Sequence, residues 1–284
     1  MFTKAYAKIN LGLNCLGKRE DGYHDLETIM LPISLHDSLE ISINKYEKED
    51  DFITCDQTSI KISKYNSVHK AIVAAREEFG FKERFNVQIH KNIFLQAGLG
   101  GSSADAGAVL RAIVKLLKLK PTREQLINIA IKVGSDVPWS YFSKPAILKK
   151  KGEELEEFTH KSPFYVLLIK PQEGCSTAEI FKKADNQANL IQCNINEIKE
   201  AFLNNDIDLL DRIVTNSLQE VAIETVPEIQ NIIDDLKANG LKCVCMTGSG
   251  STVFALSKDK KDFKKLLQKY DKLGYQTAEC ELIR

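Results

Sequence analysis

Net charge, long apolar runs and paired cysteine motifs are all missing from this 284-residue chain. Lys and Arg together number 39, and so do Asp and Glu, so the chain as a whole has no excess charge to attract nucleic acid or an acidic membrane. No apolar stretch has the length of a signal peptide or of a membrane-spanning helix. We therefore expect a soluble, cytoplasmic protein that has neither nucleic acid nor a membrane as its partner.

The seven cysteines are an odd number, and no two of them form a Cys-x-x-Cys pair. A disulfide framework needs an even set and a zinc ribbon needs such pairs, so the sequence indicates neither. Cys243 and Cys245 alternate along an apolar run, which is typical of one buried face of a strand. We expect all seven to be reduced thiols.

Alternating residues near the N-terminus predict a half-buried strand. Over residues 5–13, apolar side chains alternate with polar or small ones, so that Lys8 and Asn10 point to the same side. An Asp-Gly turn signal at 21–22 and further extended regions, one up to residue 31 and one over 39–43, predict that an antiparallel sheet opens the chain. This pattern favours an α+β fold over a doubly wound parallel sheet.

The chain is long enough for two domains or one large one, and its hydrophobic content of 43% is ample for a packed core. We place a domain boundary near Lys161, which gives domains of residues 1–160 and 161–284. Periodicity predicts a helix over 67–78, a strand over 85–89, and later helices over 196–203, 209–222 and 228–238, with two strands around a glycine turn at 247–250.

A glycine-rich segment lies directly before an amphipathic helix. Residues 98–103 read Gly-Leu-Gly-Gly-Ser-Ser, and apolar residues then recur at helical spacing up to Leu117. Glycines let a ligand touch the main chain, and the serines add N-cap capacity and hydroxyl groups. Because the unpaired N–H groups at a helix N-terminus favour an anion, the segment predicts a phosphate site.

Three known phosphate or catalytic patterns do not fit this segment. A P-loop needs a lysine after the glycines, and a dinucleotide fingerprint needs a glycine where Ser103 stands. A nucleophile elbow at Gly100–Ala104, with Asp136 and His160 downstream, would need a mostly parallel sheet, which the antiparallel start opposes. The structural alternative to a phosphate site at residues 98–103 is a tight loop with a helix cap. For Gly248 and Gly250 the structural alternative is a hairpin turn.

Asp136 stands after a predicted helix end. Thr122 and Gln125 are typical of a capping box, and the helix that they begin should end near Gly134. Pro138 disfavours helical geometry at Val137, so we expect Asp136 on a turn or an extended connection. Catalytic groups are often placed on such connections, although an Asp there is also a common turn former.

Three ordered segments resemble the motifs of the GHMP kinases. They are Ala-Lys-Ile-Asn-Leu at 7–11, Gly-Leu-Gly-Gly-Ser-Ser-Ala-Asp at 98–105 and Thr-Gly-Ser-Gly at 247–250. Asp-Gly-Tyr-His at 21–24 and Gly-Ser-Asp-Val-Pro at 134–138 are similar to the branch of that family that phosphorylates a cytidine diphosphate-linked methylerythritol on the non-mevalonate route to isopentenyl diphosphate. The resemblance implies an N-terminal domain like domain 2 of ribosomal protein S5 and a C-terminal ferredoxin-like α/β sandwich.

The resemblance also implies roles for individual residues in phosphoryl transfer from ATP to the 2-hydroxyl of the acceptor. Asp136 would take the hydroxyl proton, and Lys8 would lie beside it, keep the carboxylate ionised and stabilise charge near the γ-phosphate. Mg²⁺ would shield the triphosphate, with Ser103 as a candidate ligand. The ATP loop would comprise Phe94, Leu95, Gln96, Ala97, Gly98, Leu99, Gly100, Gly101, Ser102, Ser103 and Ala104.

The acceptor side follows in the same way. Tyr23 and His24 would line the cytidine pocket, and Phe181 would sandwich the base from the other side. Asn10 would contact the diphosphate or the polyol, and the acceptor set is completed by Thr177, Gly248 and Ser249. We expect a monomer or a weak homodimer.

The sequence departs from the family at three positions: Phe94 replaces a proline, Met30 stands where some members have an aromatic residue, and Ser251 replaces proline or alanine. Two alternatives stay open. One is another GHMP kinase, acting on a mevalonate derivative, homoserine or a sugar, and the other is a non-catalytic nucleotide-binding or RNA-binding module.

Overall fold

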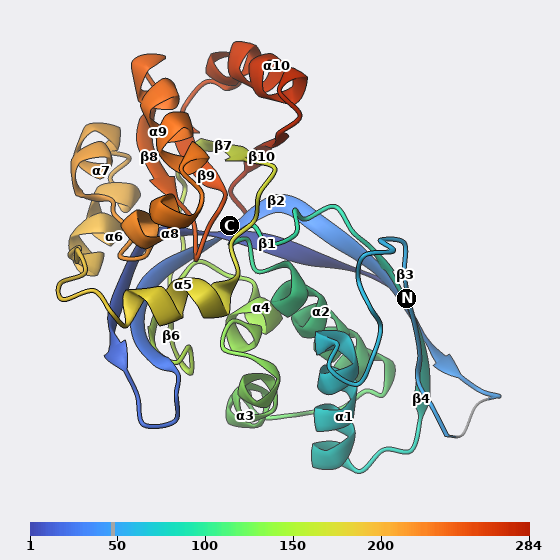
Figure 1. Cartoon of the computed structure of the whole chain (residues 1–284). Helices are drawn as coiled ribbons and strands as arrows, with labels where there is room; N and C mark the ends of the chain where they lie inside the picture. Colours follow the sequence, from blue (N-terminus) through green and yellow to red (C-terminus); the bar gives the residue numbers. More distant parts are fainter. Residues whose placement is uncertain (47–48) are drawn as a thin grey trace. The chain divides into compact units, whose positions relative to one another are not determined.

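A computed structural model of the chain describes residues 1–46 and 49–284 (Figure 1). The chain divides into two compact units. Unit 1 comprises Met1–Ala7, Leu35–Ile93 and Gly100–Ser143, and unit 2 comprises Lys8–Ser34, Phe94–Leu99 and Lys144–Arg284. Two long strands, β1 (Phe2–Lys18) and β2 (His24–Asn44), therefore contribute to both units. The predicted division into residues 1–160 and 161–284 stays a prediction.

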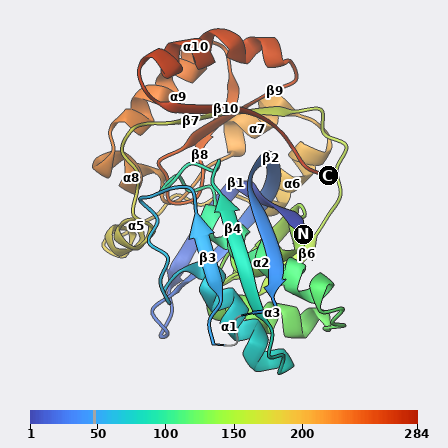
Figure 2. The ribbon, with the colours of Figure 1, turned by 90° about the vertical axis from the view of Figure 1, so that its right-hand side faces the viewer.

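Unit 1 contains three strands that lie side by side in the order β3, β4, β2 (Figure 2). β4 (Arg84–His90) pairs antiparallel with β2 over Ser38–Asn44, and β3 (Phe52–Cys55) pairs parallel with β4. The strand predicted over 85–89 is confirmed. The extended regions predicted separately up to residue 31 and over 39–43 belong to one strand, β2, which is continuous from His24 to Asn44.

The helices of unit 1 are α1 (Ser67–Phe79), α2 (Gly101–Leu116), α3 (Arg123–Val133) and α4 (Val137–Phe142). α3 begins with the predicted capping box, in which Thr122 and Gln125 each bond the other's backbone N–H. α4 was not predicted. The prediction that Pro138 keeps Val137 out of helical geometry is wrong, since Val137 is the first residue of α4. Pro138 is the second residue, where a missing N–H removes no helical hydrogen bond.

Helices α2 and α4 approach each other at Gly107. A Cβ atom on Gly107 would lie 2.6 Å from the carbonyl carbon of Ser140 and 2.7 Å from the amide nitrogen of Tyr141. The Arg111 guanidinium, one turn later on α2, donates to the backbone oxygens of Ser140 and Tyr141. Burial lowers the pKa of Arg111 to about 10, so it remains charged at neutral pH. The start of α4, where Asp136 stands, is thus fixed relative to α2.

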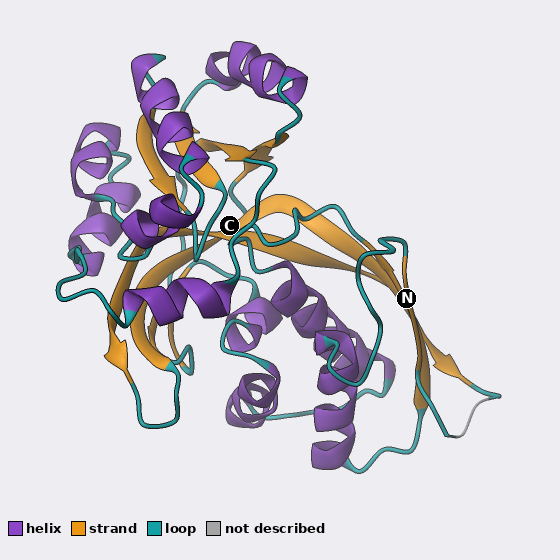
Figure 3. Cartoon of the chain, in the orientation of Figure 1, coloured by secondary structure: helices purple, strands orange, loops and turns teal. Residues whose placement is uncertain are grey.

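Unit 2 contains a second, fully antiparallel sheet in the order β10, β7, β9, β8. Its strands are β7 (Tyr165–Lys170), β8 (Lys242–Met246), β9 (Val253–Ser257) and β10 (Gln276–Glu281). Helices α9 (Glu228–Ala238) and α10 (Lys264–Lys272) pack against this sheet (Figure 3). In the same unit, β5 (Ala146–Lys150) pairs antiparallel with β2 and with β6 (Glu154–Glu157). The two units confirm the expected α+β class.

The remaining helices of unit 2 correct one prediction. They are α5 (Thr177–Ala184), α6 (Ile195–Leu203), α7 (Ile207–Ile213), α8 (Gln219–Thr225) and the 3₁₀ turn η1 (Lys260–Phe263). The single helix predicted over 209–222 is wrong, because the chain leaves the helix between α7 and α8 to pair with β1. Leu13 donates its N–H to the Thr215 carbonyl and accepts from the Ser217 N–H.

The seven cysteines, all within the described residues, are free thiols, as predicted. Cys243 and Cys245 are both buried, and burial raises the pKa of each, to about 12 for Cys245. The strand does not alternate regularly there, because a β-bulge lies between Lys242 and Cys245 and Val244 is buried as well. Within residues 1–46 and 49–284, no helix combines the length and the apolar character that crossing a membrane requires.

Replacing Gly107 by alanine tests the contact between α2 and α4. In an ordinary helix interior this change stabilises by about 1 kcal/mol. Here we expect Gly107→Ala to lower the free energy of unfolding by about 1–3 kcal/mol, because the new methyl group would overlap the backbone of Ser140. Urea denaturation measures the difference.

Gly134→Ala is the matched control, since its new Cβ would meet only the Val137 side chain at 3.5 Å. The control should change stability by less than about 1 kcal/mol. A Gly107→Ala protein as stable as the parent would contradict the proposed role of this contact.

Candidate functional site

Two glycine turns meet backbone to backbone in unit 2. Gly98 and Gly248 both have left-handed φ angles, of 70° and 58°. A Cβ on Gly98 would overlap the Thr247 carbonyl oxygen, and one on Gly248 would lie 2.7 Å from the Gly98 carbonyl oxygen. Only glycine permits this approach. The turn at 247–250 also connects the antiparallel strands β8 and β9, so the hairpin interpretation of that turn is confirmed.

Lys8 and Asn10 reach the same place from β1, which confirms that they share one side of the strand. The Lys8 Nζ donates to the Gly98 carbonyl oxygen at 2.6 Å and to Asn10 Oδ1. The Asn10 backbone N–H donates to Thr247 Oγ1 at 3.0 Å. Both side chains are buried, with exposed fractions of 4% and 1%. A cationic group and an amide therefore lie at the junction of the two glycine turns.

Asn216 also supports this junction, although sequence reasoning missed it. Its buried amide nitrogen donates to the carbonyl oxygens of Met246 and Gly248, at 2.9 and 2.8 Å. Asn216 lies between α7 and α8, within the stretch that periodicity predicts as one helix. The one available signal was that asparagine is a poor residue for a helix interior.

The start of α5 packs on the segment that leads into Gly98. The Cys175 N–H donates to the Gln96 carbonyl oxygen at 3.2 Å, and a Cβ on Gly174 would lie 2.5 Å from the Gln96 Cβ. The hydroxyl groups of Thr177 and Ser249 lie 2.9 Å apart. The structure thus brings the predicted residues Thr177, Gly248 and Ser249 together with Gln96 and Gly98 in unit 2.

His24 and Phe181, both assigned to a pyrimidine pocket, are in contact. Their ring centroids are 4.6 Å apart at an interplanar angle of 32°. The His24 Nε2 lies 2.6 Å from Asp185 Oδ1, and Lys18 pairs with the other oxygen of that carboxylate. Hydrogen bonds from Lys18 and His24 lower the pKa of Asp185. Tyr23 is 47% exposed, and the Lys151 Nζ lies 3.3 Å from its ring centroid.

The N-terminus of α2 belongs to unit 1 and has no side-chain cap. Its N-cap is Gly100, with a left-handed φ of 71°, so neither serine uses its capacity to cap the helix. Ser102 and Ser103 lie in the first turn instead, because the helix already begins at Gly101. An uncapped helix start leaves N–H groups and the positive end of the dipole for an anion.

Asp136, also in unit 1, is half-buried at the N-cap of α4 with φ −85° and ψ −7°. Asp136 therefore stands on a turn, which is one of the two conformations predicted for it, a turn or an extended connection. Lys8 belongs to unit 2, and the predicted pairing of the two side chains stays a prediction. Among the described residues, no group of three His, Cys, Asp or Glu side chains could hold a metal ion, and the role of Ser103 toward Mg²⁺ also stays a prediction.

Comparisons with known proteins agree with the motifs. Residues 66–144 match the GHMP kinases N terminal domain, and residues 198–276 match the GHMP kinases C terminal domain. A Streptococcus uberis protein provisionally named 4-diphosphocytidyl-2-C-methyl-D-erythritol kinase is 37% identical, over 92% of this chain and 91% of its own length. A Streptococcus mutans protein with the same provisional name is also 37% identical, over 92% of each chain.

Solved structures show the same relationship. A crystal structure of 4-(cytidine 5'-diphospho)-2C-methyl-D-erythritol kinase superposes with a TM-score of 0.79 at 26% identity and covers 99% of both chains. A homoserine kinase from Cytophaga hutchinsonii, at 16% identity and a TM-score of 0.78, covers 99% of this chain and 96% of its own and shares the fold. From the two domain matches and the similarity over nearly its full length, the chain belongs to the GHMP kinase family.

Proposed function

We propose that this protein phosphorylates the 2-hydroxyl of 4-diphosphocytidyl-2-C-methyl-D-erythritol with ATP, on the non-mevalonate route to isopentenyl diphosphate. As a GHMP kinase it is an ATP-dependent small-molecule kinase. The observation that carries the site assignment is the convergence of Lys8 and Asn10 on the two glycine turns. The choice of acceptor rests on the names of the relatives and on the aromatic pair of His24 and Phe181.

We assign the triphosphate of ATP to the segment Phe94–Ala104. The α2 N-terminus has no side-chain cap, and this feature fits a ligand that is bound by main-chain N–H groups. When bound, Mg²⁺ neutralises part of the triphosphate charge, and the Ser103 hydroxyl in the first turn of α2 is the ligand that we assign to it. A single hydroxyl suits Mg²⁺, which keeps several waters and phosphate oxygens as ligands.

The chemical step requires a proton acceptor and a cation. We assign Asp136 as the group that accepts the proton from the acceptor's 2-hydroxyl, which leaves the oxygen free to attack phosphorus. Lys8 then stabilises the charge on the transferring phosphoryl group. The Gly98 carbonyl oxygen and Asn10 Oδ1 aim the Lys8 Nζ, so that the strand delivers the ammonium group in a defined position.

The acceptor side is assigned to Asn10, Tyr23, His24, Thr177, Phe181, Gly248 and Ser249. His24 and Phe181 already stack on each other, so a pyrimidine can lie between them only if the rings separate. Asp185, the C-cap of α5, holds the His24 imidazole through a hydrogen bond, so the rings would separate by rotation of the Phe181 side chain. We further propose that the protein acts in the cytoplasm as a monomer or weak homodimer, without nucleic acid or membrane as a partner.

A substrate panel tests the proposed acceptor. With ATP and Mg²⁺ we expect ADP formation with 4-diphosphocytidyl-2-C-methyl-D-erythritol and little with mevalonate, phosphomevalonate, homoserine or galactose, measured by a coupled ADP assay. Robust turnover of an acceptor that lacks cytidine would overturn the choice. Salt-sensitive RNA binding without ATP turnover would instead favour the non-catalytic alternative.

Asp136→Asn tests the assigned base. We expect kcat to fall about 100-fold or more, because the amide cannot accept the hydroxyl proton, while the Kd for a non-hydrolysable ATP analogue stays within about twofold. Calorimetric titration measures the Kd. Glu124→Gln, which removes a carboxylate from the first turn of α3, should change neither quantity. Unchanged turnover in Asp136→Asn would sink the assignment.

Phe181→Ala tests the pyrimidine contact. Stacking of a base on an aromatic ring contributes about 1–3 kcal/mol, so we expect the acceptor KM to rise about 5- to 150-fold. The KM for ATP should not change, since the substitution leaves the glycine segment intact. Lys182→Ala, an exposed neighbour on α5, is the control. An equal rise in both KM values would contradict the assignment.

A further inference from the structure

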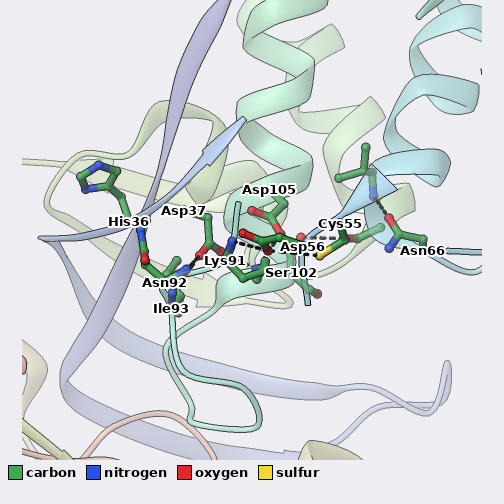
Figure 4. Close-up of polar contacts among 12 residues, drawn as sticks. His36, Asp37, Cys55, Asp56, Asn66, Lys91, Asn92, Ile93, Ser102 and Asp105 are labelled. Carbon is green, nitrogen blue, oxygen red and sulfur yellow. Dashed lines mark hydrogen bonds and ion pairs between the residues drawn. The ribbon is translucent and has the colours of Figure 1, made fainter. Parts of the chain in front are cut away.

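A buried ionic cluster lies outside the site described above, in unit 1 (Figure 4). Lys91 follows the end of β4, Asp37 belongs to β2, and Asp105 lies in the second turn of α2. The Lys91 Nζ donates to Asp105 Oδ2 at 2.7 Å and also to Asp37 Oδ2. All three side chains are buried, with exposed fractions of 5% for Lys91, 0% for Asp37 and 6% for Asp105.

Asp37 also holds the backbone that leads into the glycine segment. Its Oδ1 accepts the N–H groups of Asn92 and Ile93, at 2.6 and 2.8 Å. Burial lowers the pKa of Lys91 and its two carboxylate partners raise it, with a net rise, so the ammonium group stays charged. The residues before the glycine segment are therefore fixed by charge-assisted hydrogen bonds.

Asp105 brings the other end of the segment into the same cluster. It stands four residues after Gly101, the first residue of α2. A Cβ on Gly101 would lie 3.2 Å from Ile93 Cγ2 and 3.6 Å from the Lys91 Nζ, so the residues just before Phe94–Ala104 lie against the first residue of α2. Apolar side chains would fill this space at a smaller desolvation cost than an ion cluster. Unlike apolar packing, however, the hydrogen bonds of the cluster fix the orientation of the groups that they join.

We propose that Lys91, bridging Asp37 and Asp105, is a positioning residue that ties the backbone before the segment Phe94–Ala104 to helix α2 and thereby sets the affinity for the nucleotide. The proposal rests on the assignment of this segment to the ATP phosphates. Lys91 is not itself a phosphate ligand, because its ammonium group is buried and held by two carboxylates. Its removal should therefore weaken nucleotide binding through Asp105 and leave the acceptor KM unchanged.

A double-mutant cycle tests this coupling. Lys91→Met, Asp105→Asn and the double variant are compared by calorimetric titration with a non-hydrolysable ATP analogue. Because burial raises the pKa of Asp105 to about 7, the titrations are run at pH 8, where its carboxylate is largely ionised. We expect each single change to raise the Kd about 3- to 100-fold and the double change to raise it less than the product of the two.

Three further measurements complete the test. Lys91→Arg, which keeps the charge, should recover part of the affinity, and Lys115→Met on the exposed face of α2 should leave the Kd unchanged. The acceptor KM should stay within about twofold in all variants. If Lys91→Met does not fold, Asp105→Asn carries the test, since it keeps the shape of the side chain and replaces the carboxylate by a neutral amide.

Hydrogen exchange without nucleotide separates this proposal from the proposed function. Lys91→Met should speed exchange at Asn92, Ile93 and the first turn of α2, and not in α3. If the parent protein binds no nucleotide, the proposed function fails and the exchange result still decides whether the cluster ties the segment. The proposal would be overturned if the two single changes had independent, multiplicative effects on the Kd. It would also be overturned if a folded Lys91→Met protein had the Kd and the hydrogen exchange of the parent.

Discussion

The close approach of the glycine turns at Gly98 and Gly248 is the constraint on which the rest of the site in unit 2 depends. Each glycine faces a carbonyl oxygen of the other turn, at a separation that no Cβ atom would allow. Lys8 donates to one of these carbonyl groups, and Asn10 bonds the side chain of Thr247 at the base of the other turn. A side chain at either glycine would part the turns and move both polar groups of β1 with them.

Buried hydrogen bonds support this approach. Asn216 satisfies two carbonyl oxygens of the second turn, and Asn10 Nδ2 donates to Thr28, whose hydroxyl in turn donates to the Gly12 carbonyl oxygen. These groups are buried, so each unmade hydrogen bond would cost the desolvation energy of its donor or acceptor. The network therefore holds the lysine and the asparagine of β1 in one arrangement before any ligand arrives.

Local patterns in the sequence predicted the parts of this site that depend on neighbours along the chain. The alternation over residues 5–13 placed Lys8 and Asn10 on one side, and the capping box at Thr122 marked the start of α3. Predictions failed where contacts with distant segments of the chain determine the local structure. The break at Val214–Leu218 exists because Leu13, about two hundred residues earlier, pairs with Thr215 and Ser217, and periodicity within a helix cannot register such a partner. Asn216 was missed for the same reason.

The serines of the glycine segment show a second limit of local reasoning. Serine is a favoured N-cap, yet Gly100 takes that position because its left-handed φ turns the chain into α2. The two hydroxyl groups then fall in the first turn of the helix. Which residue caps a helix thus depends on the backbone angle at which the preceding loop arrives, and local sequence preferences do not determine that angle.

The same geometry explains why the segment matches no P-loop. A P-loop places its lysine directly after the glycines, so that one stretch of chain supplies both the N–H groups and the cation. Here the glycine segment contains no lysine, and the ammonium group of Lys8 reaches it from β1, ninety residues earlier, through its hydrogen bond to the Gly98 carbonyl oxygen. The cation therefore comes from a strand that is distant in the sequence, and the glycine segment itself helps to aim it through the Gly98 carbonyl oxygen. The price is a second glycine turn, since Gly248 must keep clear the space that the Lys8 Nζ occupies, at 2.8 Å from where its own Cβ would stand.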